Sequence, residues 1–99
     1  EIGELIFLDS LLLYSNGLTG TIPHQIGHLD KLRWLDLSNN DLTGSIPEQI
    51  YSLSQLDKFY LYSNLLGGSI HTHIGNLQNM RELWLYDNEL TGEIPSQIG

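Results

Sequence analysis

Residues 32–55 read LRWLDLSNNDLTGSIPEQIYSLSQ, and the chain repeats this arrangement at a fixed interval of 24 residues. Shifting the sequence by one interval aligns columns of identical residues, of which the clearest are Asn16, Asn40, Asn64 and Asn88, and Gly20, Gly44, Gly68 and Gly92. Columns of Leu and Ile align in the same way, and no insertion interrupts the register. Self-similarity of this kind predicts a solenoid of stacked structural repeats.

Each repeat is predicted to contain a strand followed by a tight turn. Leu35, Asp36 and Leu37 alternate apolar and polar residues, which is typical of a strand with one buried face. The corresponding strands are expected at residues 11–13, 59–61 and 83–85. The Asn that follows is expected to bond backbone groups of the inward turn, and its copies to form a ladder. The Gly permits a positive φ, and the Ile-Pro step cannot lie inside a helix.

This period and spacing closely resemble the plant-specific class of leucine-rich repeats, whose pattern is LxxLxLxxNxLxGxIPxxIGxLxx. Residues 8–31, LDSLLLYSNGLTGTIPHQIGHLDK, follow the pattern as residues 32–55 do. Departures occur at single positions, which are Tyr51, Phe59, Gly67, His71 and Met80. The resemblance implies an α/β-type repeat solenoid, a right-handed curved superhelix with a parallel β-sheet on its concave side and 3₁₀-type turns on its convex side.

The repeats divide the chain, residues 1–99, into one leucine-rich-repeat segment with complete repeats at 8–31, 32–55 and 56–79. Residues 1–7 match the tail of a repeat, and residues 80–99 form a partial one. Because both ends fall inside a repeat without a polar cap, we expect an interior piece of a longer array. The alternative is a complete short protein whose ends stack on neighbouring molecules.

Composition excludes several classes of function. The chain has 12 acidic and 4 basic residues, a net charge of −8 and no Cys. The charge disfavours nucleic acid as a partner, and the lack of Cys excludes disulfides and thiol catalysis. No apolar run reaches the ~20 residues that span a bilayer, so we expect no membrane contact by this segment. Enzyme motifs and clustered metal ligands are missing, so we expect no catalysis, cofactor or metal site.

The positions that face out of the concave sheet are the ones that packing leaves unspecified. The candidate ligand-binding residues there are Tyr14, Trp34, Asp36, Lys58, Tyr60, Tyr62, Glu82, Trp84 and Tyr86, and Ser10, Leu12 and Ser38 complete the predicted exposed surface. Six of these twelve residues are aromatic, an enrichment typical of surfaces that anchor a partner. Adjacent strands lie ~4.8 Å apart, so Tyr60 is expected beside Trp84 and Tyr62 beside Tyr86. The alternative role of the rings is to stabilise the sheet by ~0.2–1 kcal/mol per cross-strand pair.

Carboxylates accompany the aromatic positions on or beside the predicted strands, at Asp36, Asp41, Glu82, Asp87 and Glu89. They either steer a basic peptide towards the rings or form an ordinary solvated surface. The residues themselves favour the solvated surface.

The family resemblance implies a non-catalytic recognition module that binds a peptide or protein ligand, with a co-receptor as a further partner and a glycan as an alternative ligand. The implied parent is a receptor-like kinase or receptor-like protein that acts on the extracellular side of the plasma membrane, with any kinase domain outside this segment. A secreted inhibitor resembling polygalacturonase-inhibiting proteins is the alternative. A third interpretation is a surface-binding protein that uses a ladder of hydroxyl groups at Thr19, Thr21, Thr43, Ser45, Ser69 and Thr91 against ice or polysaccharide.

Overall fold

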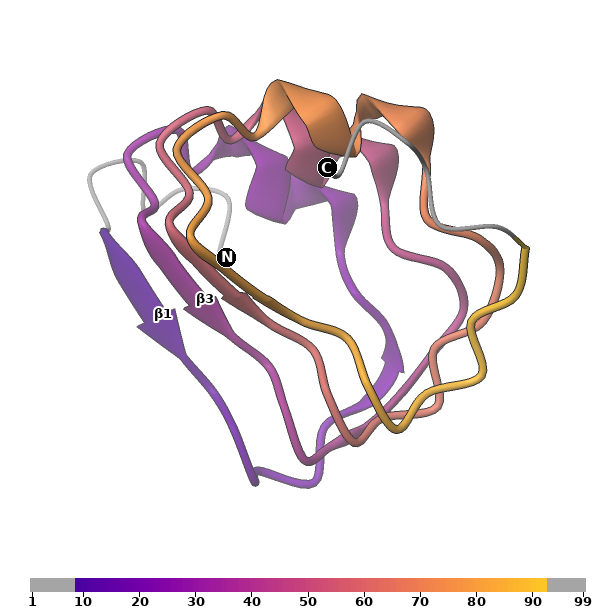
Figure 1. Ribbon diagram of the computed structural model, residues 1–99. Helices are drawn as coiled ribbons and strands as arrows, with labels where there is room; N and C mark the ends of the chain where they lie inside the picture. The colour runs from indigo at the N-terminus through magenta and orange to yellow at the C-terminus, as the bar shows by residue number, and fades with distance from the viewer. Residues whose placement is uncertain (1–8, 93–99) are drawn as a thin grey trace.

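Each repeat folds into one turn of a coil, and the coils stack side by side in the computed structural model, which describes residues 9–92 (Figure 1). A parallel sheet forms one wall of the stack, and short helices return the chain at the far end of each coil. The described residues extend over 34 × 30 × 19 Å. The repeat solenoid predicted from the sequence is therefore confirmed.

The main sheet contains β1 (Ser10–Leu12), β3 (Trp34–Asp36), β5 (Lys58–Tyr60) and β6 (Glu82–Trp84), all parallel and in that order. Strand pairing follows the repeat, so Leu35 lies between Leu11 and Phe59. Each strand begins one residue earlier than the alternation predicted. The hydrogen-bond ladder continues past the strand ends, because the Leu13 amide donates to the Asp36 carbonyl oxygen at 2.9 Å.

The opposite part of each coil combines extended backbone with 3₁₀ turns. A second parallel pair is formed by β2 (Thr19–Thr21) and β4 (Asp41–Thr43), and the turns are η2 (His24–His28), η3 (Glu48–Ser52) and η4 (Thr72–Asn76). Pro23 and Pro47 precede the first two turns with φ of −68° and −63°, values that suit proline. His71 takes the equivalent place before η4 with φ of −74°, and its Nδ1 accepts a hydrogen bond from the His73 amide at 3.0 Å. The departure at His71 therefore preserves the turn.

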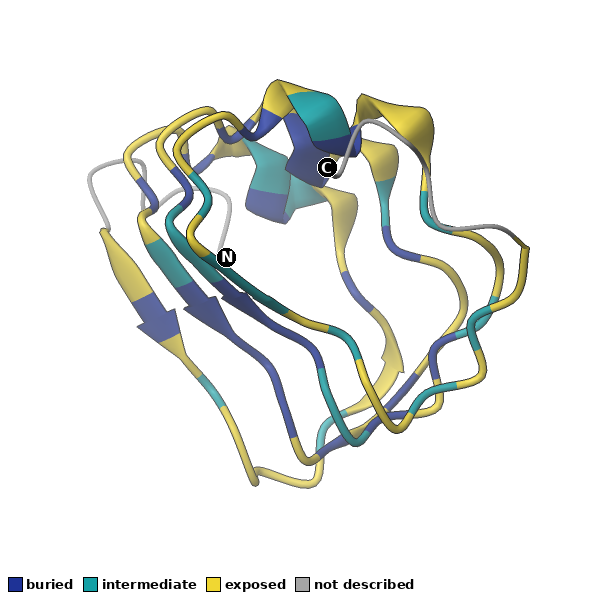
Figure 2. Cartoon of the chain, viewed as in Figure 1, coloured by how far each residue is buried: buried dark blue, intermediate teal, exposed yellow. Residues whose placement is uncertain are grey.

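Inward Leu and Ile side chains from successive repeats pack into one continuous core. The buried segments recur on neighbouring coils (Figure 2). Leu35, Phe59 and Leu61 are completely buried, so the Phe that replaces Leu in the third repeat fits the interior. Gly27 lets η2 approach η3 closely, because a Cβ at this position would lie 2.8 Å from the carbonyl oxygen of Gln49. The core thus joins the coils through apolar packing along the whole stack.

The inward turn after each main strand is held by the side-chain amide of the repeated Asn. The Oδ1 of Asn40 accepts hydrogen bonds from the amides of Asn16 and Leu18, each at 2.9 Å. Its Nδ2 donates to the carbonyl oxygens of Leu13 and Leu37, each at 3.0 Å. The next two Asn residues of the column make corresponding bonds. One side chain therefore satisfies backbone groups in its own coil and in the preceding coil.

Asn64→Ala should lower the free energy of unfolding by roughly 2–4 kcal/mol, because it leaves several buried backbone groups without partners. The groups at risk are the Leu42 amide and the carbonyl oxygens of Leu37 and Leu61. Urea unfolding followed by circular dichroism measures the loss. Asn16→Ala is the matched control, because this Asn is exposed, and its loss should stay below about 1 kcal/mol. Equal losses in the free energy of unfolding for the two variants would show that the buried Asn contributes no more to stability than the exposed one.

Candidate functional site

Aromatic side chains form two stacked pairs on the concave face of the main sheet. Tyr60 stacks on Trp84 with ring centroids 4.2 Å apart and planes 9° apart. Tyr62 stacks on Tyr86 at 4.8 Å and 8°. Trp34 meets Tyr60 edge-on, with centroids 6.3 Å apart and planes 75° apart. The two ring pairs expected from the strand spacing are therefore confirmed.

The Tyr60 hydroxyl is committed to a neighbour within this face. It donates a hydrogen bond to Oε1 of Glu82, on the adjacent strand. Burial, together with this hydrogen bond and the negative charge of Glu82, raises the pKa of Tyr60 to about 12. Tyr60 is therefore a neutral donor at physiological pH, and Glu82 is already engaged as an acceptor.

Lys58 and Trp34 form a second internal contact on the same face. The Lys58 Nζ lies 4.5 Å from the centroid of the Trp34 ring, in the arrangement of a cation–π contact. The two residues are register partners on β5 and β3. The indole Nε1 of Trp34 is buried and has no hydrogen-bond partner. Trp34 thus offers its ring to Lys58 and leaves one polar atom unsatisfied.

The prediction that all twelve outward positions are exposed is wrong for Asp36, Ser38 and Tyr60, whose exposed fractions are 6%, 0% and 7%. The Ser38 hydroxyl and amide both donate to Oδ1 of Asp36, at 2.6 and 3.1 Å. Asp36 also lies between the larger Leu12 and Tyr60 in the strand register. Outward direction alone did not predict exposure, because neighbouring repeats carry side chains of very different size. These three residues form the floor of the concave face.

The accessible part of this face is aromatic along β5 and β6, whereas on β1 the exposed residues are Ser10 and Leu12. Trp84 is 42% exposed and Tyr86 is 57% exposed, and Tyr62 lies half-buried with its ring 5.9 Å from that of Trp84. Tyr14 is also exposed, but among residues 9–92 it has no ring contact with the others. The rings brought together are those of Trp34, Tyr60, Tyr62, Trp84 and Tyr86.

The candidate steering carboxylates differ in how available they are. Asp36 and Glu82 accept hydrogen bonds from Ser38 and Tyr60, so their charges are engaged within the protein. Asp41, Asp87 and Glu89 are exposed and lie beyond the ends of the main strands. The two carboxylates on the main strands are therefore hydrogen-bonded within the protein, whereas the other three are open to solvent.

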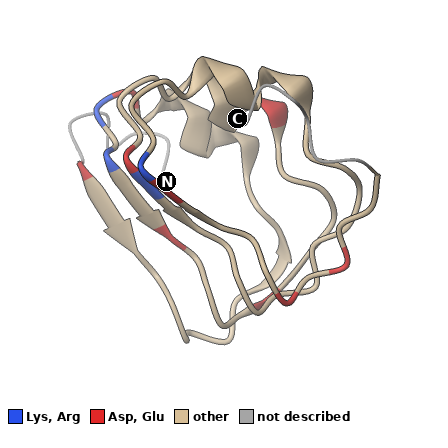
Figure 3. Cartoon of the chain, in the orientation of Figure 1, with Lys and Arg blue, Asp and Glu red and all other residues tan. Residues whose placement is uncertain are grey.

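A polar site that the sequence alone did not suggest lies at the edge where the main strands begin (Figure 3). Arg81 pairs with Asp57 through Nε to Oδ1 at 2.8 Å and Nη2 to Oδ2 at 2.5 Å. The Arg81 guanidinium holds the pKa of Asp57 below its ordinary value. A signal was present in the repeat, because the residues at 24-residue intervals alternate in charge along Asp9, Arg33, Asp57 and Arg81.

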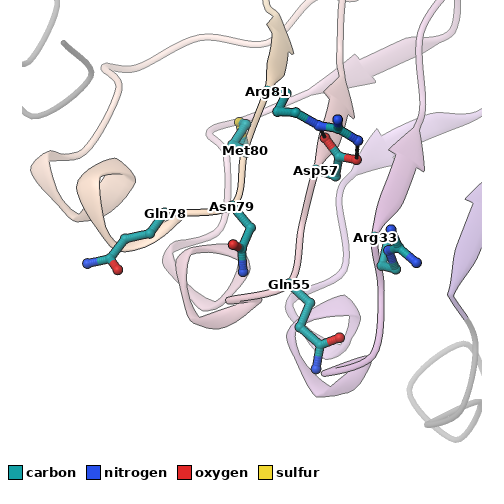
Figure 4. Close-up of a pocket in the computed structure, with 7 residues that line it drawn as sticks. All are labelled: Arg33, Gln55, Asp57, Gln78, Asn79, Met80 and Arg81. Carbon is teal, nitrogen blue, oxygen red and sulfur yellow. Dashed lines mark hydrogen bonds and ion pairs between the residues drawn. The ribbon is translucent and has the colours of Figure 1, made fainter.

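Two cavities adjoin this edge. The larger, about 470 Å³, is lined by the Arg81–Asp57 pair, by Arg33 and by polar side chains that include Gln55 and Asn79 (Figure 4). The smaller, about 270 Å³, shares these three charged residues and extends to Trp34 and Lys58. The edge and the concave face are therefore connected through these cavities.

The second sheet holds Thr19, Thr21 and Thr43 of the hydroxyl ladder. The six residues of the ladder are all exposed, and Thr21 pairs with Thr43 while Ser69 and Thr91 form an isolated bridge. Thr19 pairs with Asp41, so the ladder is interrupted by a carboxylate. Residues 9–92 contain no group of three or more His, Cys, Asp or Glu side chains placed to hold a metal ion. No helix in this described range has the length and apolar character needed to cross a membrane.

Family models for the leucine rich repeat match residues 7–66 and residues 79–99. No curated protein sequence gives a significant match. Among solved structures, the chain is similar to the plant peptide hormone receptor RGFR1 in complex with RGF2, at 49% identity and a TM-score of 0.89, covering 90% of this chain and 14% of that chain.

Two further structures extend the comparison. The Arabidopsis receptor kinase HAESA in complex with the peptide hormone IDA and the co-receptor SERK1 is 38% identical with a TM-score of 0.79, covering 81% of this chain and 13% of that chain. A plant ice-binding protein is 37% identical with a TM-score of 0.90, covering 98% of this chain and 32% of that chain. The chain thus spans a third or less of each of these proteins.

Glu82→Gln should lower the pKa of Tyr60 from about 12 while leaving it above 10, because burial, the larger cause of the shift, remains. The near-ultraviolet absorbance of tyrosinate, measured against a Tyr60→Phe reference, follows this titration. Because the folded-state pKa is raised, the associated stability is complete below about pH 10 and is lost as the pH rises towards 12. Tyr60→Phe should lack this alkaline loss. An unchanged Tyr60 titration in Glu82→Gln would show that the carboxylate contributes nothing.

Proposed function

The chain belongs to the leucine-rich repeat family, and we propose that it is a non-catalytic recognition segment of a receptor-like protein. Its role is to bind a peptide or protein ligand through the concave face. The observation that carries this proposal is the pair of ring stacks on that face, with Trp84 and Tyr86 presented to solvent.

The solved relatives support the same class of function. RGFR1 is a peptide hormone receptor in complex with RGF2, and HAESA is in complex with the peptide hormone IDA and the co-receptor SERK1. By analogy, the parent protein acts on the extracellular side of the plasma membrane and engages a co-receptor, and a kinase domain resides in another part of it. Because the chain spans 14% and 13% of these relatives, the statements about the parent protein belong to the proposal.

The geometry favours capture of a partner over a purely structural role for the outermost rings. Each stacked pair holds its rings in a fixed orientation, so little rotamer entropy is lost when a ligand covers them. Tyr60 already supplies the buried packing between strands, whereas Trp84 and Tyr86 retain large exposed areas. Exposed aromatic area of this kind is typical of the anchoring residues of interfaces. Binding here buries ring surface that the fold leaves in water.

Peptides selected from a random-sequence library against the chain should bind the double variant Trp84→Ala/Tyr86→Ala at least about tenfold more weakly than the original chain. Leu65→Ala is the matched control, because Leu65 is 48% exposed and lies outside the main sheet. Surface plasmon resonance measures the three affinities. Peptides that bind all three chains equally would exclude the ring surface. Failure to select any specific peptide would count against peptide capture by this segment.

The second sheet favours a second candidate function, which is binding to an ice surface. Its exposed hydroxyl ladder, with Thr21 beside Thr43, accompanies the similarity to a plant ice-binding protein. On this hypothesis, Thr21→Leu/Thr43→Leu should abolish thermal hysteresis, since the ordered hydroxyl surface is replaced by bulky apolar groups. Trp84→Ala/Tyr86→Ala should keep the effect. An original chain without measurable thermal hysteresis would eliminate this candidate.

A further inference from the structure

A column of alternating charges crosses the coils just before the main strands begin. Its members are Asp9, Arg33, Asp57 and Arg81, one from each successive repeat. Their backbones are joined, since the Arg33 amide donates to the Asp9 carbonyl oxygen at 2.8 Å and the Asp57 amide donates to the Arg33 carbonyl oxygen at 2.7 Å. The column is therefore a fixed row in which each side chain stands beside its neighbours.

The side chains of this row do not pair evenly. Arg81 takes both carboxylate oxygens of Asp57. Within residues 9–92, Arg81–Asp57 is the one ion pair. Arg33 lies between Asp9 and Asp57 in the row but forms no ion pair with a carboxylate in that part of the chain. An unpaired guanidinium presents several donors in a planar fork that matches a carboxylate.

Further donors surround the same space. The cavity of about 270 Å³ is lined by Arg33, Lys58, Trp34 and Ser10, together with members of the charged row. The Nε1 of Trp34 is itself buried, so the ring of this residue, and not its N–H, adjoins the cavity. Guanidinium, ammonium and hydroxyl donors thus meet at one cavity. Of the two carboxylates there, Asp57 is already paired with Arg81, so the donors of Arg33 and Lys58 have room for a further acceptor.

The local charge limits what the acceptor is. Arg33, Lys58 and Arg81 outnumber Asp9 and Asp57 around the cavity by one positive charge, although the whole chain has a net charge of −8. A ligand with a single negative charge neutralises this surplus. A phosphate, which carries nearly two negative charges, or a polyanion is repelled by the surrounding protein.

We propose that this cavity binds the carboxylate of one acidic side chain from a partner polypeptide. Arg33 and Lys58 supply the charged donors, and the Trp34 ring lies beside them and reports on the site. The neighbouring larger cavity adds side-chain amides such as those of Gln55 and Asn79, which suit the backbone on either side of an acidic residue (Figure 4). This site lies at the strand-start edge and is independent of partner capture by Trp84 and Tyr86.

The test uses the complete 99-residue chain and two short peptides, acetyl-Gly-Glu-Gly-amide and acetyl-Gly-Gln-Gly-amide, at constant ionic strength. NMR follows the indole N–H resonance of Trp34, which Trp84→Phe distinguishes from that of the second Trp. The Glu peptide should shift this resonance saturably, and the Gln peptide should bind at least about tenfold more weakly. Inorganic phosphate, as a third probe, should bind more weakly than the Glu peptide.

Arg33→Gln and Lys58→Met should each weaken binding of the Glu peptide about tenfold, because each removes a charged donor. Lys31→Gln is the charge-matched control, since Lys31 lines neither cavity, and its affinity should change less than about twofold. The amide spectrum of each variant reports whether the fold is kept, and two independent cavity variants guard against one misfolding. An unmoved Trp34 resonance, equal binding of the two peptides, or an equal loss in Lys31→Gln would overturn the proposal. Loss of the ring-surface ligand in Trp84→Ala/Tyr86→Ala leaves this result unaffected.

Discussion

The fold depends on one interaction, the bridge that a buried Asn amide makes between consecutive coils. A chain that turns inward after a short strand exposes backbone amides and carbonyl groups to an apolar interior, and each one left unpaired is costly. Asn40 satisfies both the amides and the carbonyl groups, because its side chain has an acceptor oxygen and an NH₂ group that donates two hydrogens. Since its partners lie in two coils, the same bonds close the turn and tie each coil to the preceding one, next to the backbone hydrogen bonds that set the separation of the strands.

That separation determines what the concave face becomes. Strands held in register bring outward residues of neighbouring repeats into contact, so Tyr60 stacks on Trp84 and Lys58 lies over Trp34. Several polar groups on this face are therefore bonded within the protein, among them the Tyr60 hydroxyl, which donates to Glu82. What remains for a partner is aromatic surface on and just after β6, the last strand of the described sheet, and polar donors at the strand-start edge. The two surfaces differ in kind, and a ligand that spans both meets an apolar and an ionic contact.

The architecture was predictable from the sequence because it follows from repeated residues. Register, inward Leu positions and the neighbours Tyr60 and Trp84 all derive from the 24-residue interval. Exposure at Asp36 and Ser38 was not predictable in this way, because it depends on the size of side chains one repeat away and on a bond between the two residues. The cavity around Arg33 was not predictable from single residues for a related reason. Each charged residue is ordinary by itself, and only the alternation of Asp and Arg at 24-residue intervals indicates that they lie together.

The bridging amides also bear on how such a chain changes length over evolution. Each coil contains the Asn that bonds it to the preceding coil, so a duplicated repeat already includes the side chain that it needs to join the stack. An insertion of any other length within a turn shifts an Asn away from the groups it serves and misaligns the columns beyond it. Whole repeats are therefore the natural unit of gain and loss. Recognition surfaces can then be lengthened or reshuffled by moving complete coils, each with its own set of outward residues.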